Sequence, residues 1–393
     1  MNKIFSRKPL LLIFLVLWFF GGILFSQSRE RFFDTAELIS KEVRLAILYP
    51  SLKSIQCLVE LRKQGFLPRE HLIVIGVYRE KEFTDYQKSK KKTDYEKSME
   101  FVKENNLEWF KFHQISGELR KDRLFQKNSC SAEFEEIFKK SDGIIFFGGE
   151  DIPPYIYKKK TNLLTNIETP YRHFLELSFI FHLLGGFQDE KFKPFLESKT
   201  EFPILCICLG AQSLNVGTGG TLIQDIWSEM YGKKYLEDVI ALPRENWHKN
   251  PFSSLYPEEK LLSDNIHRIK LSEKGKFILD LGFKGEDTPY VISAHHQMVD
   301  ELGKEIKIAA TSLDGKVIEA IEHEKYPDVL GVQFHPELPI LWDVNQKFRL
   351  TPQDKEKKSL HLILENNPPS FAFHKKIWTW FSQKLKEYHK SKQ

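Results

Sequence analysis

The chain has 393 residues and a formal net charge of +4, and 41% of its residues are hydrophobic. This length allows one large or two modest domains, and the apolar and aromatic content is ample for a packed core, which excludes a disordered protein. Lys and Arg number 58 against 54 Asp and Glu, with the two signs interleaved along the chain. The charge therefore predicts no nucleic-acid surface.

The first residues have the pattern of an export segment. Lys3, Arg7 and Lys8 precede an apolar run at 9–25, and Ser26-Gln27-Ser28 is a small-x-small cleavage signal. The run is near the lower limit of roughly 17 residues for a membrane-spanning helix. Residues 1–28 are therefore predicted to be a signal peptide, which we favour, or an uncleaved anchor that would be the chain's only membrane contact. Either way we expect the catalytic part in the periplasm or cell envelope, or secreted.

After this segment, apolar stretches alternate with helical patterns. Strands are predicted at 43–49, 71–78, 109–115 and 142–147, helices at 52–64 and 83–105, and further strands at 269–271, 290–294, 306–312, 317–322 and 329–334. This alternation predicts an α/β fold with a central, mostly parallel sheet flanked by helices. Active sites in such sheets lie at the carboxyl ends of the strands.

The predicted domain covers 41–393 and contains two additions. One is 228–263, which carries Tyr231, Tyr235 and Trp247 and would either form a lid over a substrate or cover an edge of the sheet. The other is 338–369. The last segment is predicted to be a helix packed on the core, because its apolar residues recur at helical spacing: Phe373, Ile377, Trp378, Phe381 and Leu385.

An apolar segment that runs directly into a cysteine is the most informative feature of the chain. Residues 203–207 (PILCI) are predicted to form a buried strand, and Cys208 is followed by Leu209, Gly210 and a helix-like stretch. A tight strand-to-helix turn lifts the side chain of the residue on the turn off the sheet. The first amides of the helix then point toward that side chain. The pattern predicts Cys208 as a nucleophile.

A second buried strand pattern, 329–334, ends in His335, Pro336 and Glu337. A histidine base and a carboxylate that orients it are the partners that a thiol nucleophile needs for acyl transfer. We therefore predict a catalytic triad of Cys208, His335 and Glu337.

Four motifs resemble those of the γ-glutamyl hydrolase family, which has the class I glutamine amidotransferase-like fold. They are 142–153 (DGIIFFGGEDIP), 203–226, 293–297 (SAHHQ) and 317–337, in the expected order. Four ordered motifs rarely coincide by chance. The resemblance covers 43–337 and implies a flavodoxin-like three-layer sandwich.

The resemblance also implies further site residues. Backbone amides of Gly149 and Leu209 would form the oxyanion hole for a small γ-glutamyl substrate. Of His295 and His296, one would contact the substrate, as the family suggests for His295, and the other would pack. Gln212, at the start of the helix beside the nucleophile, would either bond the glutamyl head group or have a structural role. The chain departs from the family pattern at Glu150, Cys206, Leu209 and Ile292, which leaves the catalytic groups in place and bears on substrate identity. No cofactor is expected, and a homodimer is left open.

Four cysteines do not make a disulfide scaffold, although a single Cys57–Cys130 bridge is conceivable. Cys206 is expected to face the core as an inert neighbour of Cys208. The Cys206–Cys208 spacing could be a fragment of a metal site, but no second cluster in the sequence completes it, so no metal is expected. Arg172 and Glu176, one helical turn apart, are interpreted as a surface ion pair.

Two other functions compete with hydrolysis of γ-glutamyl amides. One is a glutaminase subunit that passes ammonia to a synthetase, which would need an acceptor domain and usually ATP. The other is an envelope binding protein that has kept the fold without catalysis. The predicted triad favours an exported cysteine hydrolase with a Cys208 thioester intermediate.

Overall fold

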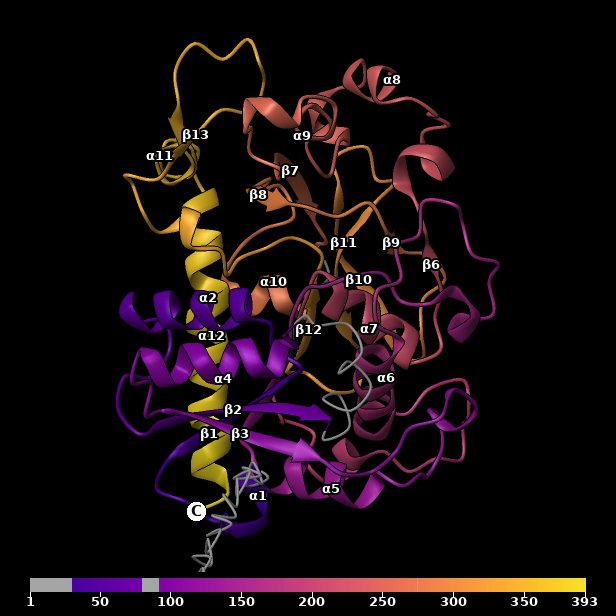
Figure 1. Cartoon of the computed structure of the whole chain (residues 1–393), viewed down its shortest axis with the longest axis vertical. Coiled ribbons are helices and arrows are strands. Elements are labelled where there is room, and N and C mark those ends of the chain that lie inside the picture. The colour runs from indigo at the N-terminus through magenta and orange to yellow at the C-terminus, as the bar shows by residue number, and fades with distance from the viewer. Residues whose placement is uncertain (1–29, 80–91, 274) are drawn as a thin grey trace, which may run out of the picture.

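The computed structural model describes residues 30–79, 92–273 and 275–393 (Figure 1). The predicted export segment, 1–28, and the first part of the predicted helix 83–105 lie outside these residues. Within the described ranges no helix is both long and apolar enough to cross a membrane.

One ten-stranded sheet runs through the molecule, in the order β3-β2-β1-β4-β5-β12-β11-β10-β7-β8. Its parallel part consists of β3 (Phe110–Ile115), β2 (Leu72–Arg79), β1 (Val43–Leu48), β4 (Gly143–Phe146), β5 (Ile204–Ile207) and β12 (Val329–Val332). Its antiparallel part adds β11 (Ile318–His323), β10 (Ile306–Ser312), β7 (Asn265–Leu271) and β8 (Tyr290–Ser293). The predicted α/β fold with a mostly parallel sheet is confirmed.

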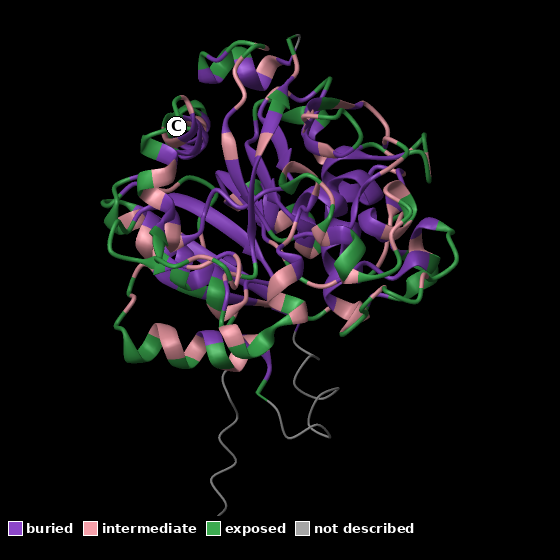
Figure 2. Ribbon diagram, turned by 90° about the horizontal axis from the view of Figure 1, so that it is seen from above, coloured by how far each residue is buried: buried purple, intermediate pink, exposed green. Residues whose placement is uncertain are grey.

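The central strands are buried at every position because both faces of the sheet are covered. Every residue of β1, β4 and β5 is buried, as expected for parallel strands with helices on either side. Figure 2 shows these buried strands at the centre of the molecule. The helices of the parallel part are α2 (Leu52–Lys63), α4 (Asp94–Glu104), α5 (Ser131–Lys140), α6 (Pro170–Leu184) and α7 (Leu209–Gly217).

Local capping explains where the first helices begin. The Ser51 side chain accepts a hydrogen bond from the Ser54 amide at the start of α2, and Thr93 and Glu96 form a capping box at the start of α4. Toward the middle of the sheet, α6 packs on α7, and α7 packs on β4, β5 and β12. The helix that follows Cys208 therefore lies over the three strands that carry the predicted motifs.

The two predicted additions lie next to each other, as α9 and β13 show in Figure 1. The Leu262 amide donates to the Arg349 carbonyl at 2.9 Å. The first addition holds the π-helical turn η4 (Ile226–Met230), α8 (Leu236–Ile240), η5 (Arg244–Asn246), α9 (Pro251–Leu255) and η6 (Pro257–Glu259). The second holds η7 (Pro339–Leu341), β13 (Lys347–Phe348), β14 (Lys358–Ser359) and α11 (Leu360–Glu365).

The first addition packs against neighbouring segments through a small apolar cluster. Trp247 is buried there with Ile226, Trp227, Val239, Met298 and Val317, so its ring is not available to stack on a substrate, in contrast to the sequence interpretation. Tyr235 is 68% exposed. The remaining elements are α1 (Phe32–Thr35), η1 (Lys121–Arg123), η2 (Pro154–Tyr157), η3 (Phe195–Ser198), β6 (Leu222–Ile223), α10 (Lys276–Leu281), β9 (Met298–Val299) and α12 (Ser370–Ser391).

The long helix α12 belongs to the core, as predicted. The five residues named from its spacing are fully buried: Phe373, Ile377, Trp378, Phe381 and Leu385. The Trp378 indole donates from Nε1 to the Pro336 carbonyl at 2.8 Å. This bond ties the helix to the segment between the two predicted catalytic residues His335 and Glu337.

Candidate active site

Cys208 lies on a strained turn between β5 and α7. Its backbone angles are φ +55° and ψ −108°, a region that non-glycine residues rarely occupy. Its amide donates to the Val332 carbonyl at 2.7 Å, which holds the turn against β12. A Cβ at Gly210 would collide with the Phe146 carbonyl oxygen, so only glycine lets α7 start this close to β4. Strain of this kind is typical of a nucleophile that must stand clear of the sheet.

His335 and Glu337 form the partner pair at the end of β12. His335 Nδ1 lies 2.8 Å from Glu337 Oε1, and the His335 amide donates to the Ile292 carbonyl at 2.9 Å. Burial alone would lower the pKa of His335, but the Glu337 carboxylate and the Cys208 thiolate raise it well above its ordinary value. Both neighbours therefore stabilise the protonated imidazole that forms when His335 accepts a proton.

The loop after β4 brings the third part of the site to these residues. A Cβ at Gly148 would lie 3.2 Å from His335 Cε1 and 3.4 Å from Cys208 Cβ, so the backbone of Gly148 passes close to both residues. Cys208 and His335 keep exposed fractions of 7% and 9%. The structure thus brings the three predicted catalytic side chains and the glycine loop together, nearly enclosed by protein.

The two predicted oxyanion donors are adjacent. Gly149 packs against the Leu209 side chain, and Leu209 is the first residue of α7. The first amides of a helix have no acceptor within it, so they are available to an anion. The role of these two amides stays a prediction, with geometry that is consistent with it.

Arg172 and Glu176 are not a surface pair, so that interpretation was wrong. Both are buried on α6, and Arg172 Nε lies 2.8 Å from Glu176 Oε1. Arg172 Nη2 also donates to the carbonyl oxygens of Phe147 and Gly148, each at 3.0 Å. With those carbonyls turned toward the guanidinium, Arg172 fixes the loop that carries the predicted oxyanion donor.

Gln212 and Gln333 link the nucleophile helix to the end of β12. Gln212 Nε2 lies 3.3 Å from both the Gln297 carbonyl and Gln333 Oε1, and Gln333 Nε2 lies 3.7 Å from Cys208 Sγ. Gln212 has a structural role here, and its substrate contact stays a prediction. Sequence reasoning missed Gln333, whose signal was a polar side chain at the end of an apolar strand.

The two adjacent histidines point to different surroundings. His295 is buried, with Nδ1 2.8 Å from the Gln297 carbonyl and Nε2 3.7 Å from Glu319. The His296 side chain is 22% exposed and lies between Asp151 and Asp225, at 3.1 and 3.4 Å. Burial alone would lower the pKa of His296, but the two carboxylates raise it to about 9. Of the two, His296 is the histidine that reaches solvent.

All four cysteines are free and buried, so a Cys57–Cys130 disulfide is not formed. Cys206 lies within β5 with no exposed surface, and burial raises the pKa of its thiol well above the ordinary value. Its inert role is consistent with this environment. Cys57 and Cys130 are protected from ionisation in the same way, and burial raises the pKa of Cys130 to about 12.

The sheet, the elbow at Cys208 and the His335–Glu337 pair define a class I glutamine amidotransferase-like protein. The family model described as peptidase C26 matches residues 124–337. The chain belongs to this family. Its general function is accordingly that of a hydrolase or amidotransferase of the γ-glutamyl amide type.

Individual proteins support the same family. The glutamine amidotransferase-like protein RP404 of Rickettsia prowazekii is 32% identical over 53% of this chain and 74% of its own length. The γ-glutamyl-γ-aminobutyrate hydrolase of Escherichia coli O157:H7 is 27% identical over 52% of this chain and 66% of its own length. A crystal structure of a GMP synthase component from Thermoplasma acidophilum covers 90% of this chain and 98% of its own, at 11% identity and a TM-score of 0.38. That score is too low to carry weight.

The buried Arg172–Glu176 pair gives a first prediction. Replacing Arg172 with Met leaves the Glu176 carboxylate buried without its partner, which should cost about 3–5 kcal/mol of unfolding free energy in denaturant titrations. The double variant R172M/E176L should recover much of that stability. It should not recover kcat, because the Phe147 and Gly148 carbonyls still lack their donor. Full recovery of kcat in the double variant would remove Arg172 as a positioning residue.

His296 gives a pH prediction. Its folded-state pKa of about 9 exceeds the ordinary 6.5, so its ionic contribution is complete below pH 6.5 and is lost as the pH rises toward 9. The difference in unfolding free energy between wild type and His296→Gln should therefore shrink over this range, by on the order of 3 kcal/mol. Urea unfolding of both proteins at several pH values measures it, and a constant difference would contradict the assignment.

Proposed function

We propose that this protein is a cysteine-dependent hydrolase of γ-glutamyl amide bonds that acts through a thioester on Cys208. The observation that carries the proposal is the convergence of Cys208, the His335–Glu337 pair and the Gly148–Gly149 loop on one edge of the sheet. Each part comes from the carboxyl end of a different strand, where α/β proteins build their sites.

The first half of the reaction forms the thioester. With Nδ1 bonded to Glu337, His335 uses its other nitrogen to take the proton from the Cys208 thiol. The thiolate attacks the amide carbonyl, and the carbonyl electron pair moves onto oxygen, where the amides of Leu209 and Gly149 stabilise it. As the oxyanion collapses, the C–N bond breaks and His335 returns the proton to the leaving amine.

The second half releases the acid. Water gives a proton to His335 and adds to the thioester carbonyl, and the C–S bond then breaks. Cys208 leaves as a thiolate, takes up the proton from His335, and the enzyme returns to its starting state. Glu337 keeps the imidazole oriented through both halves, since its contact with Nδ1 does not involve the reacting proton.

The substrate class rests on the relatives and on charge. The γ-glutamyl-γ-aminobutyrate hydrolase of Escherichia coli acts on a γ-glutamyl amide by its name. In this chain His296, charged below its pKa of about 9, lies between Asp151 and Asp225 close after the glycine loop. Such paired charges suit the carboxylate and amino groups of a glutamyl head group.

A glutaminase that delivers ammonia to a partner is the second candidate, because RP404 is named for amidotransferases. The two functions differ in the leaving group. A hydrolase should cleave γ-glutamyl peptides and γ-glutamyl anilides without a partner protein, whereas a glutaminase should prefer glutamine. Parallel assays of the purified protein with glutamine and with γ-glutamyl-p-nitroanilide separate them, and no turnover of either substrate would leave a non-catalytic binding protein.

The two neighbouring cysteines provide a matched pair of variants. Cys208→Ala should reduce kcat by on the order of 10⁴-fold or more, with an unchanged melting temperature, because few atoms change at the turn. Cys206→Ala should retain most of the activity. Iodoacetamide followed by peptide mass spectrometry should label Cys208 and spare Cys206. Activity that survives the loss of Cys208 would disprove the nucleophile assignment.

Export is the second part of the proposal, and it rests on the basic residues and apolar run at 3–25. The mature chain should begin near Arg29 if the segment is cleaved. Fractionation of the source cells with N-terminal sequencing tests this. Recovery of the chain from the cytosol with Met1 intact would refute export.

A further inference from the structure

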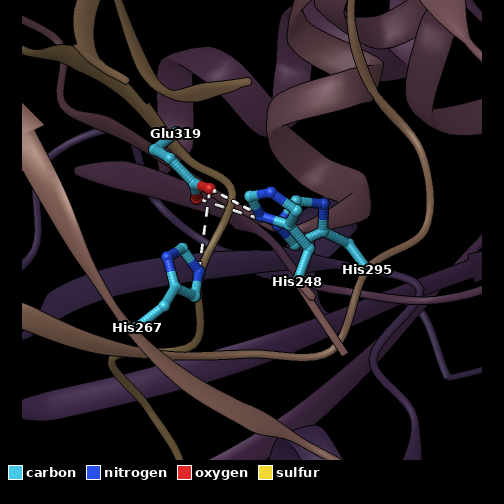
Figure 3. A group of neighbouring side chains, drawn as sticks. All are labelled: His248, His267, His295 and Glu319. Atoms are coloured by element: carbon cyan, nitrogen blue, oxygen red, sulfur yellow. Dashed lines mark ion pairs between the residues drawn. The ribbon is translucent and has the colours of Figure 1, made fainter. Parts of the chain in front are cut away.

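Four buried side chains converge away from the catalytic triad. They are His248, from the first addition; His267, on β7; His295, after β8; and Glu319, on β11. His248, His267 and Glu319 have no exposed surface, and His295 is 3% exposed. One nitrogen or oxygen atom from each lies within 4.8 Å of the others, and Figure 3 shows the three rings turned toward the carboxylate.

The facing atoms have no hydrogen-bond partners. Glu319 Oε1 lies 3.1 Å from His248 Nδ1 and 3.7 Å from His267 Nε2, and Glu319 Oε2 lies 3.7 Å from His295 Nε2. None of these contacts has the geometry of a hydrogen bond, so both carboxylate oxygens and all three nitrogens are buried and unsatisfied. An unsatisfied buried polar atom is destabilising, and more so when it is charged. A single group coordinated by all four side chains would offset this cost.

The outer nitrogens of two rings define which tautomer is present. His267 Nδ1 lies 3.2 Å from the Arg268 carbonyl and His295 Nδ1 lies 2.8 Å from the Gln297 carbonyl. A carbonyl only accepts, so each Nδ1 carries the proton, and in a neutral ring Nε2 then presents a lone pair to Glu319. Metal-binding histidines are oriented in this way, with the remote N–H bonded to a carbonyl.

His248 has a strained backbone conformation, and its hydrogen bonds hold the ring toward the cluster. His248 has φ +58°, which costs energy for a residue with a side chain. Its carbonyl accepts hydrogen bonds from Ser293 Oγ at 2.6 Å and from the His295 amide at 3.2 Å. These bonds fix the first addition against the segment after β8 and keep the His248 ring facing Glu319.

We propose that His248, His267, His295 and Glu319 bind one zinc ion. Three imidazoles and one carboxylate form a tetrahedral donor set that suits zinc. With metal–ligand bonds near 2.0–2.1 Å, donor atoms in such a site are about 3.3 Å apart. The nitrogens of His248 and His267 lie 3.1 and 3.7 Å from Glu319 Oε1, and that of His295 lies 3.7 Å from Oε2. All four donor atoms lie within 4.8 Å of one another, so small shifts of the side chains would bring them onto one ion. Four protein ligands without an exposed position make the site structural.

The zinc site joins the first addition to the antiparallel part of the sheet and adjoins the active site. The Gln297 carbonyl that accepts from His295 also accepts from Gln212 on α7. The Gln333 amide donates to the Glu319 carbonyl at 2.8 Å, and the Gln333 side chain contacts Cys208. Zinc would therefore stabilise the segments behind the nucleophile without taking part in the reaction.

Metal content of the untagged full chain tests the proposal. Inductively coupled plasma mass spectrometry should find about one zinc per chain in wild type, and His267→Gln should lose it. His374→Gln is the matched control, because His374 is equally buried but lies on α12 outside the cluster. Cys208→Ser should keep its zinc, which excludes a thiol-bound ion. Zinc content unchanged in His267→Gln would overturn the proposal.

A second measurement uses only the wild-type protein, so it tests the proposal even if His267→Gln does not fold. Wild type treated with 1,10-phenanthroline and dialysed should show a lower melting temperature, restored by zinc and not by magnesium. Cobalt added to this apoprotein should give the visible absorption of a tetrahedral site. Apoprotein that takes up neither ion, with an unchanged melting temperature, would mean that protons alone occupy the cluster and would overturn the proposal. Neither readout depends on turnover, so the γ-glutamyl hydrolase function stands or falls separately.

Discussion

The strained backbone at Cys208 is the constraint on which the site depends. The turn is held at two points, by the Cys208 amide on the Val332 carbonyl and by the approach of Gly210 to β4. Both contacts require β4, β5 and β12 to be neighbours in register. The order of the sheet is therefore what places the thiol, the histidine and the glycine loop at one edge, and the strain is offset by the burial of the three strands.

The sequence predicts those parts of the fold and site that are formed by contiguous residues. Apolar runs predicted the strands, and the residues after 207 and after 334 predicted the elbow and its partner pair, because each motif is one strand followed by its own turn. Arg172 shows the limit. Its spacing to Glu176 is the same for a surface pair and a buried one, and only the surrounding apolar residues of α6 distinguished them. Its contacts with 147 and 148 are tertiary and leave no local signal.

The histidine cluster could not be predicted from the sequence, because its residues are also brought together only by tertiary structure. Metal sites are recognised in sequence by short, fixed spacings between ligands, whereas these four ligands come from an addition, two strands and a loop. The short Cys206–Cys208 spacing has no second cluster to complete it, so the sequence predicts no metal. The antiparallel order β11-β10-β7-β8, which periodicity could not supply, together with the fold of the addition, is what brings the four residues together.

The bond from Trp378 to the Pro336 carbonyl has a consequence for how the enzyme matures. The ribosome makes the nucleophile strand well before β12, and α12 comes last in sequence order. The turn that carries His335 and Glu337 gains its indole contact only once that final helix has docked. The predicted base and its carboxylate therefore take their final backbone position only after α12 has packed on the core, which also buries Cys206.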